Sequence, residues 1–335
     1  MNLATSYLGL TLRTPLVASP SPLNADVGHL RRLEDAGIGA VVLPSLFQEQ
    51  LEAERDRLAA IHAQAADNNP EARGYLADAG LGPYGVGPEG YLDLVRRAKD
   101  ALDVPVIASI NAASVSGWVD YAAMVEEAGA DALELNIYYV PVDITQSGAQ
   151  IEQRYLDVVA AVRRAVSIPV VAKIPSFLSS VGHVVAGLAE EGAAGVVLFN
   201  RLIEPDIDLL RLKLSRELEL SSPPELRLPL LWIAILYRQV RCSLAASTGV
   251  DNAEDVLKLL LAGADVVMTT ASILRHGPDH VHTLLDGLRA WLDSRRLDSL
   301  DRVRGVMSRS RIKEPGAYER ANYISLIQTY SREHR

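Results

Sequence analysis

Cysteine is nearly absent from this sequence, and long apolar runs are missing altogether. Cys242 is the single cysteine in 335 residues, which excludes an internal disulfide and fits a reducing compartment such as the cytoplasm. Residues 1–14 lack a basic segment followed by an apolar one, so we expect no signal peptide. No run reaches the roughly 18 apolar residues of a membrane-spanning helix. We therefore expect a cytoplasmic protein without membrane contact.

Basic charge is also in short supply. Lys and Arg number 33 against 42 Asp and Glu, which gives a formal net charge of −9. This balance argues against nucleic acid or an anionic membrane as a partner. Apolar residues make up 49% of the chain and charged residues 22%, enough apolar material for a large core. No Pro/Gly/Ser-rich linker divides the sequence, so we expect residues 1–335 to form a single domain.

A glycine fingerprint is missing where an open dinucleotide-binding sheet would need one. The first apolar run ends in Ala18-Ser19 and is followed by Pro20-Ser21-Pro22, without glycine. Residues 85–90 match the letters G-x-G-x-x-G, but no apolar strand precedes them and Pro88 lies within them. We interpret them as a glycine-rich loop, and an open sheet as the less favoured fold.

Eight short apolar runs, each ending in a polar residue, dominate what is present. They are Pro15–Ser19, Ala40–Ser45, Pro105–Asn111, Ala132–Asn136, Pro169–Lys173, Gly195–Asn200, Cys242–Ser247 and Val266–Thr270. Near-continuous runs of this kind are typical of parallel strands buried on both faces. Segments with helical periodicity separate them, as in residues 151–166 and 252–262. Strand–helix alternation repeated eight times predicts a (β/α)8 TIM barrel over about residues 14–295.

Three segments exceed what such a barrel needs. They are Gln48–Gly90, for which we expect a helix over 48–66, then Arg201–Arg238, and the C-terminal extension Leu297–Arg335. Long inserts after barrel strands usually cover the active site. We expect this of the inserts after the second and sixth strands, whereas the extension could form a dimer contact.

The loops after the seventh and eighth runs predict a phosphate site. Thr248-Gly249 follows one run and Thr270-Ala271 ends and follows the other. In barrels these two loops commonly hold a phosphate through backbone N–H groups. The alternative for either loop alone is a tight turn that needs small residues.

Other polar residues end the remaining runs. Lys173 lies in an apolar stretch and either faces an anionic ligand or cofactor ring, or pairs with a carboxylate such as Glu134. Asn111, Asn136 and Asn200 end three further runs. A strand-end asparagine is usually a turn residue, but three around one rim suggest amides that bind a flat, hydrogen-bonding ring.

These residues resemble the FMN-dependent dihydroorotate dehydrogenase family, most specifically in Ala128–Asn136, Pro169–Pro175 and Ala246–Pro278. The resemblance covers about residues 3–288 and implies FMN across the barrel top, a homodimer and a role in pyrimidine biosynthesis. It implies cofactor contacts from Ala18, Ser19, Ser45, Asn111, Asn136, Lys173, Thr248, Gly249, Thr270 and Ala271. It implies a substrate contact from Asn200, and the same substrate would lie over Asn136. Arg201 is a further substrate-binding candidate because it could bind a carboxylate, with an exposed surface arginine as the alternative.

The sequence departs from that family where dihydroorotate would lose its proton. The family's second strand ends in Thr-Lys-Ser, but here it reads Leu43-Pro44-Ser45. The family's Asn-x-Ser-Cys-Pro-Asn is replaced by residues 136–141, so that Tyr139 stands in place of the cysteine base. A phenol is a poor base at neutral pH, although it can donate a proton. Tyr139 and Lys173 are the predicted catalytic residues, with Tyr138 a less favoured alternative, and Arg201 replaces a small hydroxyl residue.

Three functional hypotheses follow. The leading one is an FMN-dependent oxidoreductase that transfers hydride between flavin and a small flat, dihydropyrimidine-like substrate. The second is a phosphate-binding barrel without flavin that transfers protons through Glu134 and Lys173. The third is a barrel that binds FMN without turnover, or acts on a different substrate, with the extension as a docking element. No histidine ends a run, so we expect no metal site.

Overall fold

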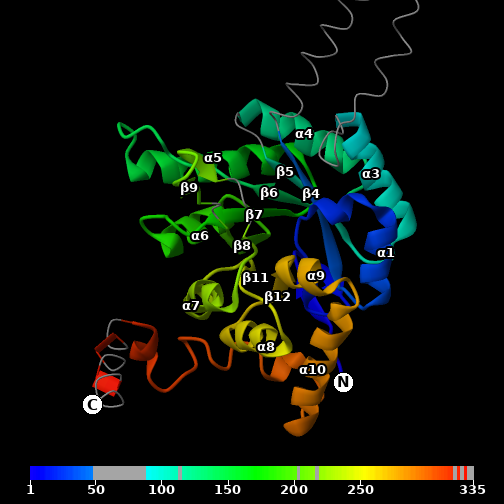
Figure 1. Cartoon of the computed structure of the whole chain (residues 1–335), viewed down its shortest axis with the longest axis vertical. Coiled ribbons are helices and arrows are strands. Elements are labelled where there is room, and N and C mark those ends of the chain that lie inside the picture. Colours follow the sequence, from blue (N-terminus) through cyan, green and yellow to red (C-terminus); the bar gives the residue numbers. More distant parts are fainter. Residues whose placement is uncertain are drawn as a thin grey trace, which may run out of the picture.

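Eight parallel strands close into a barrel in the order β11-β12-β3-β4-β5-β6-β7-β8, shown in the computed structural model (Figure 1). The structure describes residues 1–47, 88–111, 115–201, 204–215, 219–319, 323–324 and 328–329. The strands are β3 (Leu16–Ala18), β4 (Ala40–Phe47), β5 (Val106–Asn111), β6 (Ala132–Asn136), β7 (Val170–Pro175), β8 (Gly195–Asn200), β11 (Ser243–Ser247) and β12 (Val266–Thr269). The predicted (β/α)8 barrel is confirmed, and only β4 and β7 extend beyond their predicted runs.

Helices surround the barrel and pack on its outer face (Figure 1). They are α1 (Val27–Asp35), α3 (Pro88–Ala101), α4 (Val115–Glu127), α5 (Gly148–Ala165), α6 (Val181–Glu190), α7 (Arg227–Leu236), α8 (Ala253–Ala262), α9 (Ala271–His276) and α10 (His280–Ser294). The loop expected at residues 85–90 is wrong for residues 88–90, because Pro88 opens α3, a position that tolerates proline. The helix expected over 48–66 lies outside the described residues.

An N-terminal hairpin closes the bottom of the barrel. Strands β1 (Thr5–Tyr7) and β2 (Leu10–Leu12) pair antiparallel around a turn in which Leu8 and Gly9 both have positive φ, 54° and 80°, as two-residue hairpin turns require. Tyr7, Leu8 and Leu12 pack among the inward-facing residues of the barrel strands. The barrel is therefore filled from below, and a ligand can enter only at the carboxyl ends of the strands.

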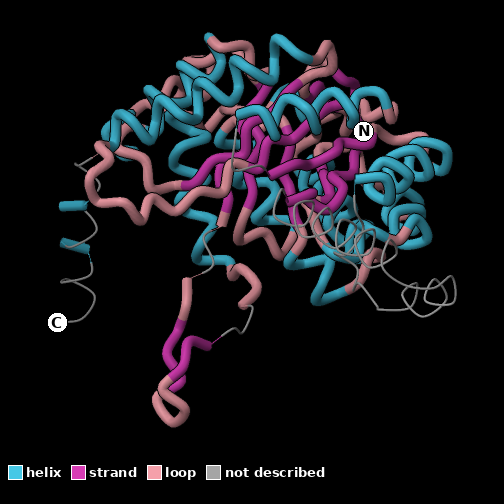
Figure 2. Tube along the Cα trace, turned by 90° about the horizontal axis from the view of Figure 1, so that it is seen from above, coloured by secondary structure: helices cyan, strands magenta, loops and turns pink. Residues whose placement is uncertain are grey.

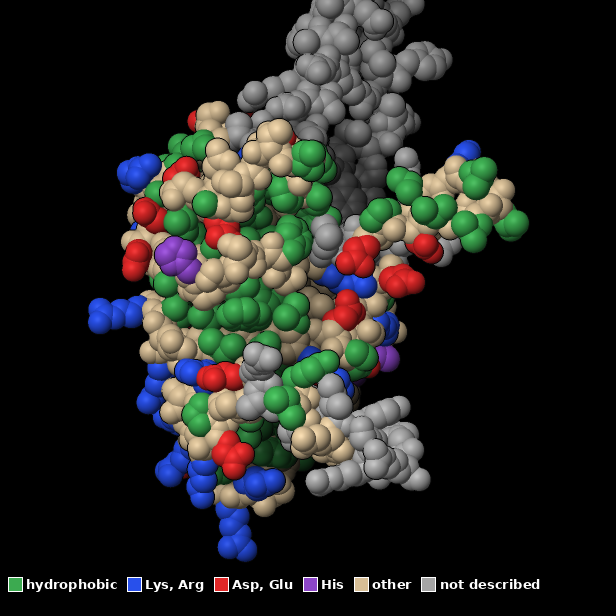
Figure 3. Space-filling view, turned by 90° about the vertical axis from the view of Figure 1, so that its left-hand side faces the viewer, with side chains coloured by type: hydrophobic (Ala, Val, Ile, Leu, Met, Phe, Trp, Pro, Cys, Tyr) green, Lys and Arg blue, Asp and Glu red, His purple; other side chains and the backbone are tan. Residues whose placement is uncertain are grey.

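Two segments lie outside the barrel. After β8 the chain forms a hairpin of β9 (Asp206–Asp208) and β10 (Lys213–Ser215), which projects from the body with exposed apolar side chains (Figures 2 and 3). The C-terminal extension instead packs on α7 and α8, where Met307 N donates to Leu261 O at 2.9 Å and Arg309 N to Ala234 O at 2.9 Å. The described part of the extension therefore contacts the helices and not the rim.

Candidate functional site

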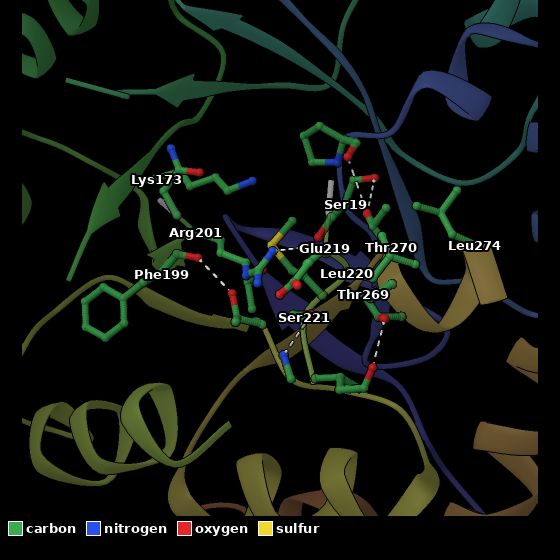
Figure 4. Close-up of a pocket in the computed structure, with 18 of the residues that line it drawn as sticks. Ser19, Lys173, Phe199, Arg201, Glu219, Leu220, Ser221, Thr269, Thr270 and Leu274 are labelled. Atoms are coloured by element: carbon green, nitrogen blue, oxygen red, sulfur yellow. Dashed lines mark hydrogen bonds between the residues drawn. The ribbon is translucent and has the colours of Figure 1, made fainter. Parts of the chain in front are cut away.

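A pocket of about 290 Å³ opens at the carboxyl ends of the strands, between the loops after β3, β8, β11 and β12 (Figure 4). We call it the mouth pocket. The predicted site residues that line it are Ser19, Lys173, Asn200, Arg201, Thr248, Gly249, Thr270 and Ala271. Residues distant in sequence, from the first strand to the last, thus share one cavity.

The loop after β11 brings its backbone close to a neighbouring segment. Thr248 and Gly249 both have positive φ, 86° and 77°. A Cβ added to Gly249 would lie 2.4 Å from Leu226 N, and Gly249 N donates to Ser221 Oγ at 3.2 Å. The turn and its packing therefore both require glycine here, independently of any ligand.

Hydroxyl groups hold the loops after β12 and β3 together. Thr270 Oγ1 donates to Ser19 O at 3.1 Å and lies 3.3 Å from Pro20 O. Helix α9 begins directly after Thr270, and the first N–H groups of a helix have no partner within it. This side of the mouth pocket therefore offers backbone donors in a frame that side-chain hydroxyls stabilise.

The opposite side of the barrel mouth contains a continuous chain of polar side chains. Lys173 Nζ lies 3.9 Å from Glu134 Oε1, which confirms the ion pair considered above. Ser109 Oγ donates to the same carboxylate oxygen at 3.1 Å and lies 2.8 Å from Ser45 Oγ. Asn136 Nδ2 donates to Ser45 Oγ at 2.9 Å, and Asn200 Nδ2 donates to Asn136 Oδ1 at 2.5 Å. We call Glu134, Ser109, Ser45, Asn136 and Asn200 the polar chain.

Strand register explains why these side chains meet. Glu134 and Asn136 are two residues apart on β6 and so point to the same face. Ser109 pairs with Glu134 on one side and with Ser45 on the other. The β4–β5 register shifts between Val42 and Ser45, where Pro44 has no N–H to donate.

Two residues that the sequence analysis missed position the strand ends. Tyr91 of α3 donates through its hydroxyl to Ser109 O at 2.9 Å and accepts from Ser109 N at 2.8 Å. Asn24 Nδ2 donates to Ser19 O at 3.0 Å and to Val42 O at 2.7 Å. Ser109 itself was also missed. A hydroxyl within the apolar run 106–110 was the one local signal.

Three buried polar atoms at the barrel mouth have no hydrogen-bond partner among the described residues. They are Ser19 Oγ, Asn111 Nδ2 and Glu134 Oε2. An unsatisfied buried polar group costs roughly 1–3 kcal/mol. The predicted cofactor residues Ser19 and Asn111 therefore fit a site that a polar ligand completes.

Tyr139 is not brought into the mouth pocket. Its hydroxyl donates to Gln146 Oε1 at 3.3 Å, and the guanidinium carbon of Arg154 lies 4.5 Å from the centre of its ring. Both partners belong to the β6–α5 loop and α5. Ala18, Ser45, Asn111 and Asn136 are buried and are not among the residues that line the mouth pocket.

Arg201 does line the mouth pocket, with much of its charge already paired. Arg201 Nε lies 2.9 Å from Glu225 Oε1, and its guanidinium also donates to Glu219 O. Partial burial raises the pKa of Glu225, but hydrogen bonds from Ser222 N and Arg201 outweigh it and lower this pKa overall. A second pocket of about 610 Å³ shares Phe199, Asn200, Arg201 and Thr248 with the first.

Neither a metal centre nor a membrane-spanning helix is found in the part of the chain that the structure describes. There, no group of three or more His, Cys, Asp or Glu side chains is placed to hold a metal ion. Within the same residues, no helix is both long enough and apolar enough to cross a bilayer.

A closed (β/α)8 barrel with small-residue loops after β11 and β12, and a buried lysine at its rim, defines a barrel enzyme that binds its ligand at the carboxyl ends of the strands. The family model described as dihydroorotate dehydrogenase matches residues 69–292, well over half of the sequence. The chain belongs to the dihydroorotate dehydrogenase family, whose members are flavin-dependent oxidoreductases in general.

Relatives along nearly the whole chain carry related names. The catalytic subunit of dihydroorotate dehydrogenase B (NAD(+)) from Methanothermobacter thermautotrophicus is 27% identical over 314 residues, covering 91% of this chain and 98% of the relative. The same subunit from Methanocaldococcus jannaschii is 24% identical over 319 residues, with 91% and 97% covered. Subunit PreA of the NAD-dependent dihydropyrimidine dehydrogenase of Escherichia coli K12 is 24% identical over 342 residues, with 91% and 76% covered.

Proposed function

We propose that this protein is an FMN-dependent oxidoreductase acting on a small, flat, dihydropyrimidine-like ring. The observation that supports this most is the position of Lys173 at the edge of the mouth pocket. The loops expected to hold a phosphate line the other end of the same pocket. A cation at one end and backbone donors at the other match a ligand with a phosphate and an electron-accepting ring.

The residues present fit FMN. Thr248, Gly249, Thr270 and Ala271 would hold its phosphate. Ser19 Oγ and Asn111 Nδ2, which have no partner among the described residues, would bind its ring system, beside Ala18, Ser45 and Asn136. When bound, FMN would supply the hydride acceptor for the substrate. The Lys173 ammonium would stabilise negative charge that develops beside it.

The substrate would lie against Asn136, Asn200 and Arg201. Two amides supply donors and acceptors that suit a ring with N–H and C=O groups. Arg201 and Asn200 contribute to both pockets, so they stand between a cofactor compartment and a second compartment. Dihydroorotate carries a carboxylate that Arg201 could bind, and oxidation of dihydroorotate belongs to pyrimidine biosynthesis.

Tyr139 is our proposed proton-transfer residue, and this role requires its hydroxyl to leave Gln146. If it transfers the proton, Tyr139→Phe should lower kcat roughly 100-fold, within the range for general acid–base groups, with flavin content unchanged. Tyr138→Phe tests the less favoured alternative in the same way, and on this proposal it should leave kcat near the wild-type value. Equal kcat values for wild type and Tyr139→Phe would assign the proton transfer to another group.

The alternatives from the sequence fare differently. A flavin-free enzyme would use the Lys173–Glu134 pair for proton transfer, but the complete burial of Glu134 keeps its carboxylate away from a substrate. In the non-catalytic alternative, the C-terminal extension docks a partner. The extension would then need a surface that is not already packed against α7 and α8. The single domain over residues 1–335, the cytoplasmic location and the homodimer stay predictions.

Purification followed by a visible spectrum tests the cofactor. We expect a yellow protein, or stoichiometric FMN uptake on reconstitution, and a protein that takes up no FMN would contradict the proposal. The loaded protein is then mixed anaerobically with dihydroorotate or dihydrouracil, and NAD⁺ or an artificial dye is added afterwards as the electron acceptor. Bleaching of the flavin by one of these rings supports the substrate class, and bleaching by neither removes it.

A further inference from the structure

The polar chain has a direction as well as a set of distances. Asn200 donates to Asn136, and Asn136 donates to Ser45. Ser45 and Ser109 share a hydrogen bond of 2.8 Å in which either hydroxyl could be the donor. Ser109 donates to Glu134, so the chain ends at a carboxylate.

The Glu134 carboxylate determines which hydroxyl donates in the hydrogen bond between Ser45 and Ser109. An ionised carboxyl group can only accept hydrogen bonds, and a serine hydroxyl has a single proton to give. Ser109 uses its proton on Glu134, so Ser45 must donate to Ser109. The Ser45 oxygen is then left to accept from the amide nitrogen of Asn136, and the Asn136 oxygen to accept from Asn200. Every link is therefore oriented toward Glu134.

The surroundings of Glu134 combine full burial, one cation and one phenol. Its side chain is completely buried, and Lys173 Nζ on β7 supplies the opposite charge at 3.9 Å. From the barrel floor, Tyr7 faces the same carboxylate. Burial first, and then the negative charge of Glu134, raise the pKa of Tyr7 well above its ordinary value. Tyr7 is therefore a neutral phenol, and Lys173 is the cation that compensates Glu134.

We propose that Glu134 is a positioning residue that fixes how Asn136 and Asn200 present their amides to the substrate, acting through Ser109 and Ser45. This inference rests on the proposed function for the identity of the ligand. In the fixed orientation, one N–H of Asn200 is bonded within the polar chain, and the side-chain carbonyl oxygen of Asn200 stays free to bond a ligand. Asn200 then offers an acceptor to a ring N–H of the substrate, and the second N–H of Asn136 offers a donor to a ring carbonyl.

A neutral residue at position 134 would remove this constraint. The amide of Glu134→Gln could donate to Ser109, Ser109 to Ser45, and Ser45 to the oxygen of a rotated Asn136 amide. Asn136 would then donate to Asn200, and Asn200 would turn its N–H groups outward. The two orientations exchange a donor for an acceptor at the pocket while leaving the shape of the side chains unchanged.

Asparagine side-chain NMR tests this orientation in the FMN-free protein. Wild type, Glu134→Gln and Ser109→Ala are labelled with ¹⁵N-asparagine, and the Asn136 and Asn200 amide signals are assigned by substitution of each residue. We expect both signals to move or double in both variants, because each variant breaks the link to the carboxylate. Ser308→Ala is the matched control, since Ser308 is a fully buried serine outside the polar chain that bonds to Ser310.

The outcome is decisive in either direction. Unchanged Asn136 and Asn200 signals in Glu134→Gln would overturn the proposal, as would equal changes in Ser308→Ala. A second arm uses FMN-loaded protein and measures orotate binding from the flavin difference spectrum. We expect Glu134→Gln to bind orotate about tenfold more weakly, the equivalent of one hydrogen bond. If wild type binds no orotate, the proposed substrate fails, while the amide signals still decide the role of Glu134.

Discussion

The two sides of the barrel mouth are built on different principles. On the β11, β12 and β3 side, hydroxyls bond to backbone groups: Thr270 Oγ1 donates to Ser19 O, and Ser221 Oγ accepts from Gly249 N. On the β4 to β8 side, side chains bond to side chains around a buried ion pair. A site made of backbone groups tolerates changes of side chain. The other side depends on particular side chains, and substitutions there change the chemistry.

Removing the buried cation should have the largest effect. Lys173→Met leaves the Glu134 carboxylate buried without its opposite charge, which costs roughly 3–5 kcal/mol of unfolding free energy. The double variant Lys173→Met/Glu134→Gln should recover most of this loss, because no charge is left buried. Urea unfolding of the FMN-free proteins measures both. If Lys173→Met were as stable as wild type, the Lys173–Glu134 ion pair would contribute nothing to the stability of the β4 to β8 side.

The backbone side is tested at Gly249. Gly249→Ala places a Cβ 2.4 Å from Leu226 N at a φ of +77°, and such strain costs roughly 1–3 kcal/mol. We expect lower stability and a loss of FMN content in the purified protein. Gly182→Ala, on helix α6 with no atom within 4 Å of the added Cβ, is the control and should retain FMN. Full flavin content in Gly249→Ala would mean that the loop after β11 does not bind the cofactor.

Asn24 and Asn111 are both buried, but we expect Asn24 to stabilise the fold and Asn111 to bind the cofactor. Asn24→Ala removes the donor to Ser19 O and Val42 O and should cost about 1–2 kcal/mol of stability. Asn111→Ala removes an amide nitrogen that has no partner among the described residues. It should leave the FMN-free protein as stable as wild type and weaken FMN binding about tenfold. Thermal melting and fluorescence titration with FMN measure the two effects, and equal destabilisation would remove the distinction.

The smallest effect concerns Glu225, which pairs with Arg201 and lines the second pocket. Hydrogen bonds from Ser222 and Arg201 lower the pKa of Glu225 despite its partial burial. Because the folded-state pKa lies below the unfolded one, this contribution is present above the ordinary carboxyl range and is lost as pH falls through the lowered value. Glu225→Gln should cost under about 1 kcal/mol at neutral pH. The difference from wild type should shrink below about pH 4, and a constant difference would mean that Glu225 does not titrate as stated.

The sequence predicted most of the fold because the strand boundaries are local. A proline or a helix-closing glycine stands at or just before the start of seven of the eight apolar runs, so the strands fall where the runs do. The polar chain could be predicted only in part, since Ser109 acquires its role from register across β4, β5 and β6. Tyr139 was identified from its place in a family motif. That motif does not encode the contacts with Gln146 and Arg154 that decide where its ring lies. The roles of individual site residues stay predictions.

The pairing of β3 with β12 also has a consequence for synthesis. Leu16 lies opposite Val267 and Ala18 opposite Thr269, so the barrel cannot close until residue 269 has left the ribosome. Until then β3 presents an unpaired edge, and the apolar residues of the N-terminal hairpin have no complete barrel to fill. Pairing over such separations is slow, and open edges invite aggregation. In a nascent chain that stops before β12, the N-terminal hairpin could not close the bottom of the barrel and the mouth pocket would lack one side. Ligand binding therefore arises only when the last strand has formed.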